Sequence, residues 1–159
     1  MTIDIRKHIL PEEIEVDGVL YPIHTDYTYF INFIELMKNP EAKVEDFNFM
    51  YADQNNLPAD LFKGVDRLSQ FCYPKEELPN VDEEEHSHKR AFDYVTDSTM
   101  IYAAFMQVYH IDLIDTPLHW HKFLALFNNL SGTRLNEVMG YRGFDKSDKE
   151  DYEHRMQRL

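Results

Sequence analysis

The sequence predicts a mainly α fold: a compact helical domain with a small N-terminal β-hairpin and an acidic loop between two helical halves. Three observations predict it. Apolar residues alternate around Asp17-Gly18, apolar residues elsewhere recur at helical spacing, and an acidic run interrupts the chain after Tyr73. We expect one domain over residues 1–159, made of an N-terminal hairpin with helices (1–73), an acidic linker (74–90), a C-terminal helical half (91–143) and a C-terminal helix (144–159).

The hairpin is predicted at residues 14–23. Apolar residues occupy every second position on both sides of Asp17-Gly18, a dipeptide that favours a tight two-residue turn. These positions are Ile14, Val16, Val19, Tyr21 and Ile23. Pro22 has no backbone N–H to donate, so we expect the second strand to lie at an edge.

Three helices are expected between the hairpin and the linker. Thr25 or Asp26 can cap the first, and Pro40 stops it. Its apolar residues keep helical spacing: Tyr27, Phe30, Ile31, Ile34 and Met37. Shorter helices are expected over residues 44–51 and 61–72.

Two longer helices are expected in the C-terminal half. The first follows Asp97 or Ser98, and its apolar stripe contains Ile101, Ala104, Phe105 and Val108. The second is expected to be capped by Asp115 or Thr116, with Pro117 in its first turn. Its buried face contains Trp120, Phe123, Leu124, Phe127 and Leu130.

Two further helices are expected near the C-terminus. Thr133 can cap a short one that ends near Gly143. Ser147, with Glu150 three positions later, forms a capping-box pattern that predicts the start of the C-terminal helix.

The net charge, the cysteine count and the length of the apolar runs restrict the class of protein. A formal charge of -13 and a pI near 4.9 make the chain repel nucleic acid and anionic lipid. Cys72 is the single cysteine and no export signal is recognisable, so we expect a soluble cytoplasmic protein. No apolar run approaches the roughly 18 to 20 residues that span a bilayer. We therefore expect neither nucleic acid nor membrane among its partners.

No catalytic pattern stands out. The 5 glycines are too scattered to form a phosphate-binding loop, and a serine nucleophile elbow is absent. Cys72 lies on an apolar stripe, which favours a small buried hydrophobe over a nucleophile. The sequence favours protein binding over catalysis, with no catalytic residue and no cofactor.

Two His-x-His pairs could suggest a metal site. On a helix, His119 and His121 would differ by about 200° and point away from each other, so they could not share an ion. His86 and His88 lie in the acidic linker, where nothing rigid would hold an ion. We expect no metal site.

Aromatic residues at helical spacing usually form a core, and the alternative is a protein-binding face. The core interpretation is favoured for Phe105, Trp120, Phe123 and Phe127. The alternative makes Tyr102, Tyr109 and Trp120 the candidate partner-binding residues, because binding surfaces favour aromatic residues.

Three stretches carry a resemblance to a known family: residues 101–113 (IYAAFMQVYHIDL), 118–123 (LHWHKF) and 139–142 (MGYR). They resemble the "gp fifteen" family of tailed-phage proteins. Its members are similar to tail assembly chaperones of long-tailed phages that infect Gram-positive bacteria. Two positions depart from the family pattern: His110 replaces an expected glycine, and His121 replaces an expected second tryptophan.

The resemblance implies a role in tail assembly. The implied partner is the tape-measure protein, and the major tail protein is a second candidate. Homo-oligomerisation is compatible with this role. The implied location is the host cytoplasm, with the protein absent from the mature virion. The alternatives are a structural tail component retained in the virion and a histidine-based, metal-dependent enzyme.

Overall fold

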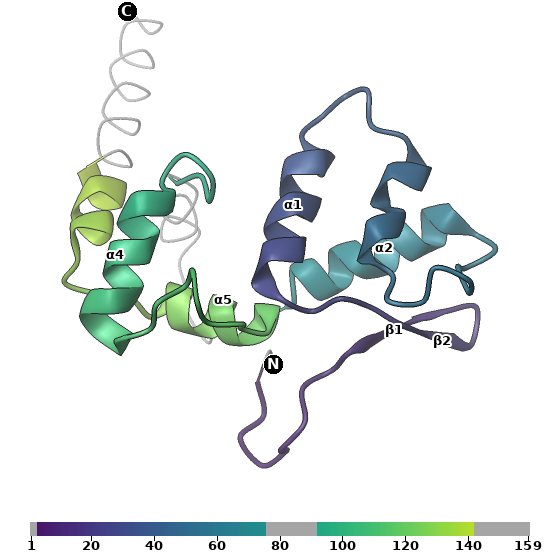
Figure 1. The fold of residues 1–159 in the computed structure, drawn as a ribbon, viewed down its shortest axis with the longest axis horizontal. Helices are drawn as coiled ribbons and strands as arrows, with labels where there is room; N and C mark the ends of the chain where they lie inside the picture. Colours follow the sequence, from purple (N-terminus) through teal and green to yellow (C-terminus); the bar gives the residue numbers. More distant parts are fainter. Residues whose placement is uncertain (1–2, 76–91, 142–159) are drawn as a thin grey trace, which may run out of the picture. The chain divides into compact units, whose positions relative to one another are not determined.

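The computed structural model describes residues 3–75 and 92–141, and it confirms the mainly α fold with a small N-terminal hairpin (Figure 1). The named elements are β1 (Glu13–Val16), β2 (Val19–Pro22), α1 (Tyr27–Met37), η1 (Val44–Met50), α2 (Leu61–Cys72), α4 (Ser98–Tyr109) and α5 (Trp120–Asn128). Residues 134–141 are also helical. Most of the predicted acidic linker and the predicted C-terminal helix (144–159) lie outside the described residues.

The chain folds into two units. The first contains Met1–Glu77 and Pro117–Leu126, and the second contains Leu78–Thr116 and Phe127–Leu159. The division predicted from the sequence differs, because it places all of residues 91–143 in one half. Residues 117–126 belong with the N-terminal unit because backbone hydrogen bonds hold them there. Trp120 N donates to Thr25 O at 2.7 Å, and Tyr27 N donates to Leu118 O at 2.9 Å.

The hairpin forms as the sequence predicts. β1 and β2 pair antiparallel, with Val16 opposite Val19 across the turn. Asp17 and Gly18 both have positive φ, 51° and 82°, which is the turn geometry that matches the twist of a hairpin. Pro22 ends β2, and its carbonyl accepts a hydrogen bond from Ala52 N at 3.0 Å. A proline fits this position because it needs only to accept.

Side-chain caps explain where α1 and α2 begin. Asp26 caps α1, because its Oδ2 accepts a hydrogen bond from Thr28 N at 3.2 Å. Asp60 caps α2 in the same way through Lys63 N, at 3.1 Å. Both caps satisfy backbone N–H groups that have no partner inside the helix. The helix expected over residues 44–51 is the 3₁₀ helix η1.

The core of the first unit contains a continuous stack of aromatic rings. Successive rings lie 4.3–5.6 Å apart and within 24° of parallel, in the order Tyr27, Phe123, Trp120, Phe30, Phe71 and His121. The stack joins α1, α2 and α5, as expected of an aromatic core. It also fixes residues 120–123 in this unit.

The start of α5 corrects the expectation that Pro117 lies in its first turn. The helix begins at Trp120, and His119 instead forms an isolated antiparallel β-bridge with Asp26. The reason is the Asp26 carboxylate, whose Oδ1 accepts a hydrogen bond from Leu118 N at 2.9 Å. This contact holds the chain extended for the residues just before the helix.

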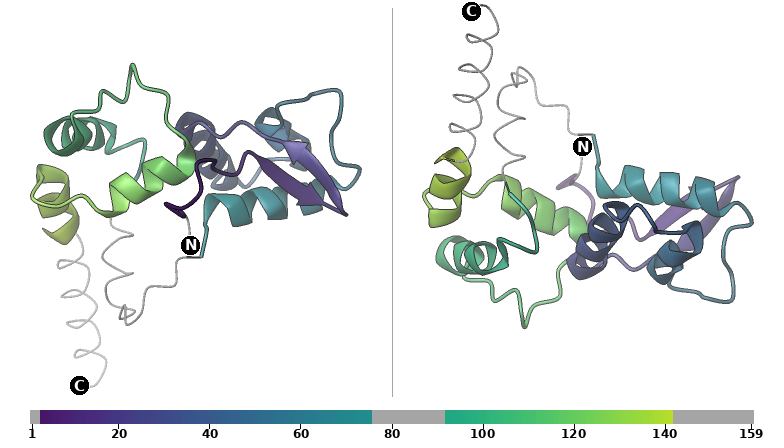
Figure 2. Two further views of the ribbon diagram at one scale, coloured as in Figure 1. Left: turned by 90° about the horizontal axis from the view of Figure 1, so that it is seen from below. Right: turned by 90° about the horizontal axis from the view of Figure 1, so that it is seen from above.

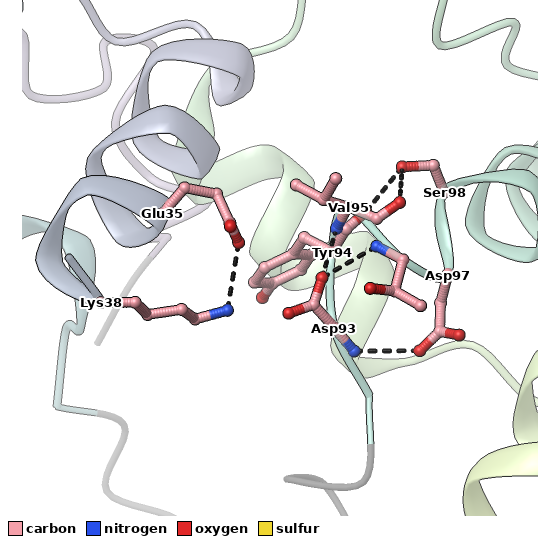
Figure 3. A network of polar contacts seen from close by, with 8 residues as sticks. Glu35, Lys38, Asp93, Tyr94, Val95, Asp97 and Ser98 are labelled. Carbon is pink, nitrogen blue, oxygen red and sulfur yellow. Dashed lines mark hydrogen bonds and ion pairs between the residues drawn. The ribbon is translucent and has the colours of Figure 1, made fainter.

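The second unit contains α4 and the helical residues 134–141, which lie side by side (Figure 2). The turn that precedes α4 is held by hydrogen bonds (Figure 3). Asp93 N donates to Asp97 Oδ2 at 2.9 Å, and Ser98 Oγ donates to Val95 O at 2.7 Å. Thr133 caps the following helix as predicted, because its Oγ1 accepts from Asn136 N at 3.2 Å.

Figure 3 also shows an ion pair within α1 and its C-cap, where Lys38 Nζ lies 3.1 Å from Glu35 Oε1. Both side chains are exposed, so the pair contributes little to stability.

His110 ends α4 in the left-handed conformation, with φ 55° and ψ 34°. This conformation costs roughly 1–2 kcal/mol for a residue with a Cβ and nothing for glycine, which agrees with the glycine expected from the family pattern. We expect His110→Gly to raise the free energy of unfolding by about 1 kcal/mol, measured by urea denaturation. Val108→Gly is the matched control and should destabilise, because Val108 lies in the right-handed helix. Destabilisation by both would contradict the strain at His110.

Candidate partner-binding surface

α4 is unusual because it has no charged residue. Its 12 residues, STMIYAAFMQVY, contain no Asp, Glu, Lys or Arg, although 28% of the chain is charged. Ser98, Thr99 and Gln107 are polar, and most of its other residues are apolar. A helix that is apolar all round is normally buried. Here only Ile101, Ala104 and Phe105 are buried. Val108, expected on the buried stripe, is 37% exposed.

Three of the remaining side chains form what we call the α4 surface: Tyr102, Met106 and Tyr109. They are spaced i, i+4 and i+7, so they lie on one stripe of the helix. Met106 is 40% exposed, and both tyrosines are half-buried. Tyr109 packs edge-on against Phe105, with ring centroids 5.6 Å apart, and burial raises its pKa. The Tyr109 ring is thus held against the buried Phe105, while part of its side chain stays exposed.

Two carboxylates border the α4 surface. A side-chain hydrogen bond with Asp112 raises the pKa of Tyr102, and the charge of Asp115 adds to the effect. The turn that carries them is fixed by Asp112, whose Oδ1 accepts from Ile114 N at 3.0 Å. Ile114 is 82% exposed at this turn. The surface therefore combines apolar side chains with an acidic border.

Further around α4, beside the α4 surface, lies a groove of about 320 Å³. It lies between α4 and the start of the helical residues 134–141, and is lined by Thr99, Met100, Ala103, Ala104, Gln107, Thr133 and Arg134. The two alanines leave room beside the helix, and Gln107 Nε2 donates to Gly132 O at 3.3 Å at one end. A large apolar side chain of another molecule could enter this groove.

The three candidate binding residues have different positions. Tyr102 and Tyr109 lie together on the α4 surface, whereas Trp120 is 1% exposed in the core of the first unit. Its Nε1 donates to Cys72 O at 2.9 Å. This burial fits the core interpretation that the sequence favours for Trp120, and its role in partner binding stays a prediction. Met106 and Ile114 were missed, and the lack of charge throughout α4 is the signal that could have found Met106.

The pair His119 and His121 is also arranged differently from the expectation. Because His119 precedes the helix, the two rings do not point away from each other: their centroids are 5.1 Å apart. His119 Nε2 is 2.8 Å from Pro11 O, and His121 Nε2 is 2.9 Å from Phe71 O. These contacts join the start of α5 to α2 and to the segment before β1. Among residues 3–75 and 92–141, no group of three or more His, Cys, Asp or Glu could hold a metal ion. His86 and His88 lie outside the described residues.

The hydrogen bonds of His119 predict a pH dependence of stability. Its Nδ1 accepts from His121 N at 3.0 Å, so the neutral ring with Nε2–H fits the fold. Burial lowers the pKa of His119, and the positive charge of Lys122 lowers it further. The hydrogen bond to Pro11 and the negative charge of Glu12 act in the opposite direction. Since the unfolded chain then binds more protons than the folded one, stability falls as the pH drops below about 6.5.

We expect His119→Gln to reduce the loss of unfolding free energy between about pH 7.5 and 5.5, measured by urea denaturation at each pH. The neighbouring His121 is kept in the variant, so the difference from the parent chain isolates His119. An identical pH dependence in both proteins would contradict the role of His119.

Cys72 behaves as a buried hydrophobe. Its side chain is 0% exposed, and burial raises the pKa of the thiol to about 12. At neutral pH it is therefore the thiol and not the reactive thiolate. Within the described ranges, no helix is long and apolar enough to cross a membrane.

Comparison with known proteins identifies the family. The profile of the family described as Bacteriophage Gp15 protein matches residues 7–159, which is nearly the whole chain. No curated protein and no solved structure matches the chain. The match includes both units and all of α4. The chain therefore belongs to the bacteriophage Gp15 protein family.

Proposed function

We propose that this phage protein is a tail assembly chaperone that binds the tape-measure protein during tail morphogenesis, with the major tail protein as a second client. The observation that carries the proposal is α4, a helix without a single charged residue that leaves Tyr102, Met106 and Tyr109 accessible. Its residues 101–109 lie in a stretch that resembles the "gp fifteen" family, whose members are similar to tail assembly chaperones of phages infecting Gram-positive bacteria. Family membership supports a phage role.

The physical requirements of such a chaperone agree with these residues. It must offer an apolar surface that adapts to a long client, and tyrosine and methionine serve this purpose. It must also avoid aggregating with its own copies, and a formal charge of -13 opposes that through mutual repulsion. Several copies bound along one client would strengthen the complex without any catalytic step or cofactor.

The proposal places the protein in the host cytoplasm and outside the mature virion. A structural tail component would use the same kind of apolar surface but would stay in the particle. Mass spectrometry of purified virions separates the two functions. Stoichiometric amounts of this chain in the particle would replace the chaperone function with the structural one.

The direct test is co-expression with the tape-measure protein of the same phage. We expect the client to become soluble and to elute with this chain in size-exclusion chromatography. Co-expression with the major tail protein tests the second client in the same way. A client that stays insoluble while this chain elutes alone would contradict the proposal for that client.

A further inference from the structure

We propose that the α4 surface binds an amphipathic helix whose apolar stripe is flanked by Lys and Arg. The inference rests on the proposed function, because it names the chemistry of the client segment. The client tape-measure protein would then contain at least one such segment, and α4 would be the element that recognises it.

The shape of α4 fits a helical partner. Positions 102, 106 and 109 follow one stripe for two turns, about 10 Å along the axis, which is a typical contact length for an apolar helix face. At 100° per residue, Ala103 lies next to Met106 on the exposed side and leads to the groove lined by Met100 and Ala103. Accessible apolar surface therefore continues from the tyrosines around the helix to a cavity that can take one large side chain.

The charge around α4 selects a basic partner. Asp112 and Asp115 border Tyr102, while α4 itself is uncharged. Across the described part of the second unit, the acidic residues are Asp93, Asp97, Asp112, Asp115 and Glu137, against Arg134 as the basic residue. A second copy would bring the same carboxylates to the contact and be repelled, whereas Lys and Arg beside an apolar stripe would be attracted. We therefore favour a basic helix over a homodimer through α4.

The test uses a synthetic amphipathic peptide of about 18 residues made of Leu and Lys, long enough to form a helix. Fluorescence anisotropy of the labelled peptide measures its Kd for the full chain. We expect Met106→Lys to weaken binding about tenfold, and Met106→Ser to weaken it without any change in charge. Val19→Lys is the matched control: Val19 is 48% exposed on β2, and the added charge is the same. It should bind as the parent does.

The electrostatic part is tested separately. Asp115→Asn should weaken binding by a few-fold and reduce its salt dependence, because one carboxylate no longer attracts the peptide. A peptide with Glu in place of every Lys should bind at least about tenfold more weakly to the parent chain. Thermal unfolding followed by circular dichroism verifies that each variant is folded.

Several results would overturn the inference. One is that Met106→Lys and Val19→Lys bind the Leu/Lys peptide with the same Kd. Another is that the parent chain binds the Glu peptide as tightly as the Leu/Lys peptide. Absence of Leu/Lys binding to the folded parent chain would do the same. So would a dimer that Met106→Lys dissociates in sedimentation experiments, because α4 would then bind a second copy. These outcomes are independent of the tape-measure protein, so failure of co-expression counts against the proposed function alone.

Discussion

Replacement of Trp120 by alanine is expected to lower the free energy of unfolding by about 3–5 kcal/mol. The indole is the largest fully buried side chain and lies in the middle of the aromatic stack, between Phe30 and Phe123 at 5.6 and 5.5 Å. Alanine would leave a cavity in that stack and remove the hydrogen bond to Cys72 O. The cavity and the lost hydrogen bond both destabilise the first unit, so both contribute to the same decrease in the free energy of unfolding.

Urea denaturation followed by far-ultraviolet circular dichroism measures this loss, since Trp120 is the chain's single tryptophan and the variant has no indole fluorescence. Trp120→Phe is the control. It keeps an aromatic ring between Phe30 and Phe123 but has no N–H for Cys72 O, so we expect a smaller loss of about 1–2 kcal/mol. If Trp120→Ala left stability within about 1 kcal/mol of the parent while client binding fell, Trp120 would act on a binding face after all.

The parts of the fold that depend on neighbouring residues could be predicted from the sequence. Asp17-Gly18 specifies its own turn, because both residues tolerate positive φ and the strands on either side pair directly across it. Asp26 and Asp60 cap helices whose first turns are adjacent in sequence. In each case the decisive contact spans only a few residues, so the sequence pattern and the structure agree.

The start of α5 could not be predicted, because it depends on a distant contact. The Asp26 carboxylate that holds Leu118 extended is 92 positions away in the sequence. Without that contact, Pro117 would fit the first turn of a helix, which is what the local pattern indicates. The same contact holds Leu118 against α1, and residues 117–126 group with the first unit.

Only part of the candidate site could be predicted from the sequence. Tyr102 and Tyr109 can be recognised from helical spacing and from the resemblance to the phage family, and both lie on the α4 surface. For Trp120 the helical spacing favours the core, and the residue is buried in contact with α1, but its local sequence alone leaves a binding face open as the alternative. For α4 itself, the absence of charge is visible in the sequence, yet only the structure tells which of its apolar residues stay accessible.

The second large effect concerns Gly64 in α2. Alanine normally stabilises a helix interior by about 1 kcal/mol relative to glycine. At this position a Cβ would overlap the hydroxyl of Tyr51, which is 2% exposed. We expect Gly64→Ala to lower the free energy of unfolding by about 1–3 kcal/mol, since the buried Tyr51 ring must move. Urea denaturation of the variant beside the parent measures the loss.

Removal of the Tyr51 hydroxyl should reverse the sign of this effect. That hydroxyl is buried, and it has no hydrogen-bond partner among residues 3–75 and 92–141. Burial also raises its pKa to about 12. Tyr51→Phe alone should therefore be neutral or slightly stabilising. In the Tyr51→Phe background the new Cβ would meet the ring carbon at 3.4 Å, an ordinary contact, so Gly64→Ala should then stabilise α2 by about 1 kcal/mol.

A double-mutant cycle therefore measures the coupling between Gly64 and the Tyr51 hydroxyl directly. We expect a coupling energy of about 2–4 kcal/mol, because the overlap exists only when both the Cβ and the hydroxyl are present. Equal effects of Gly64→Ala in the two backgrounds would show that another group limits the space at this position. A coupling of the expected size would mean that glycine is required in α2 by one buried oxygen atom, and that the helix could accept a better helix former once that atom is removed.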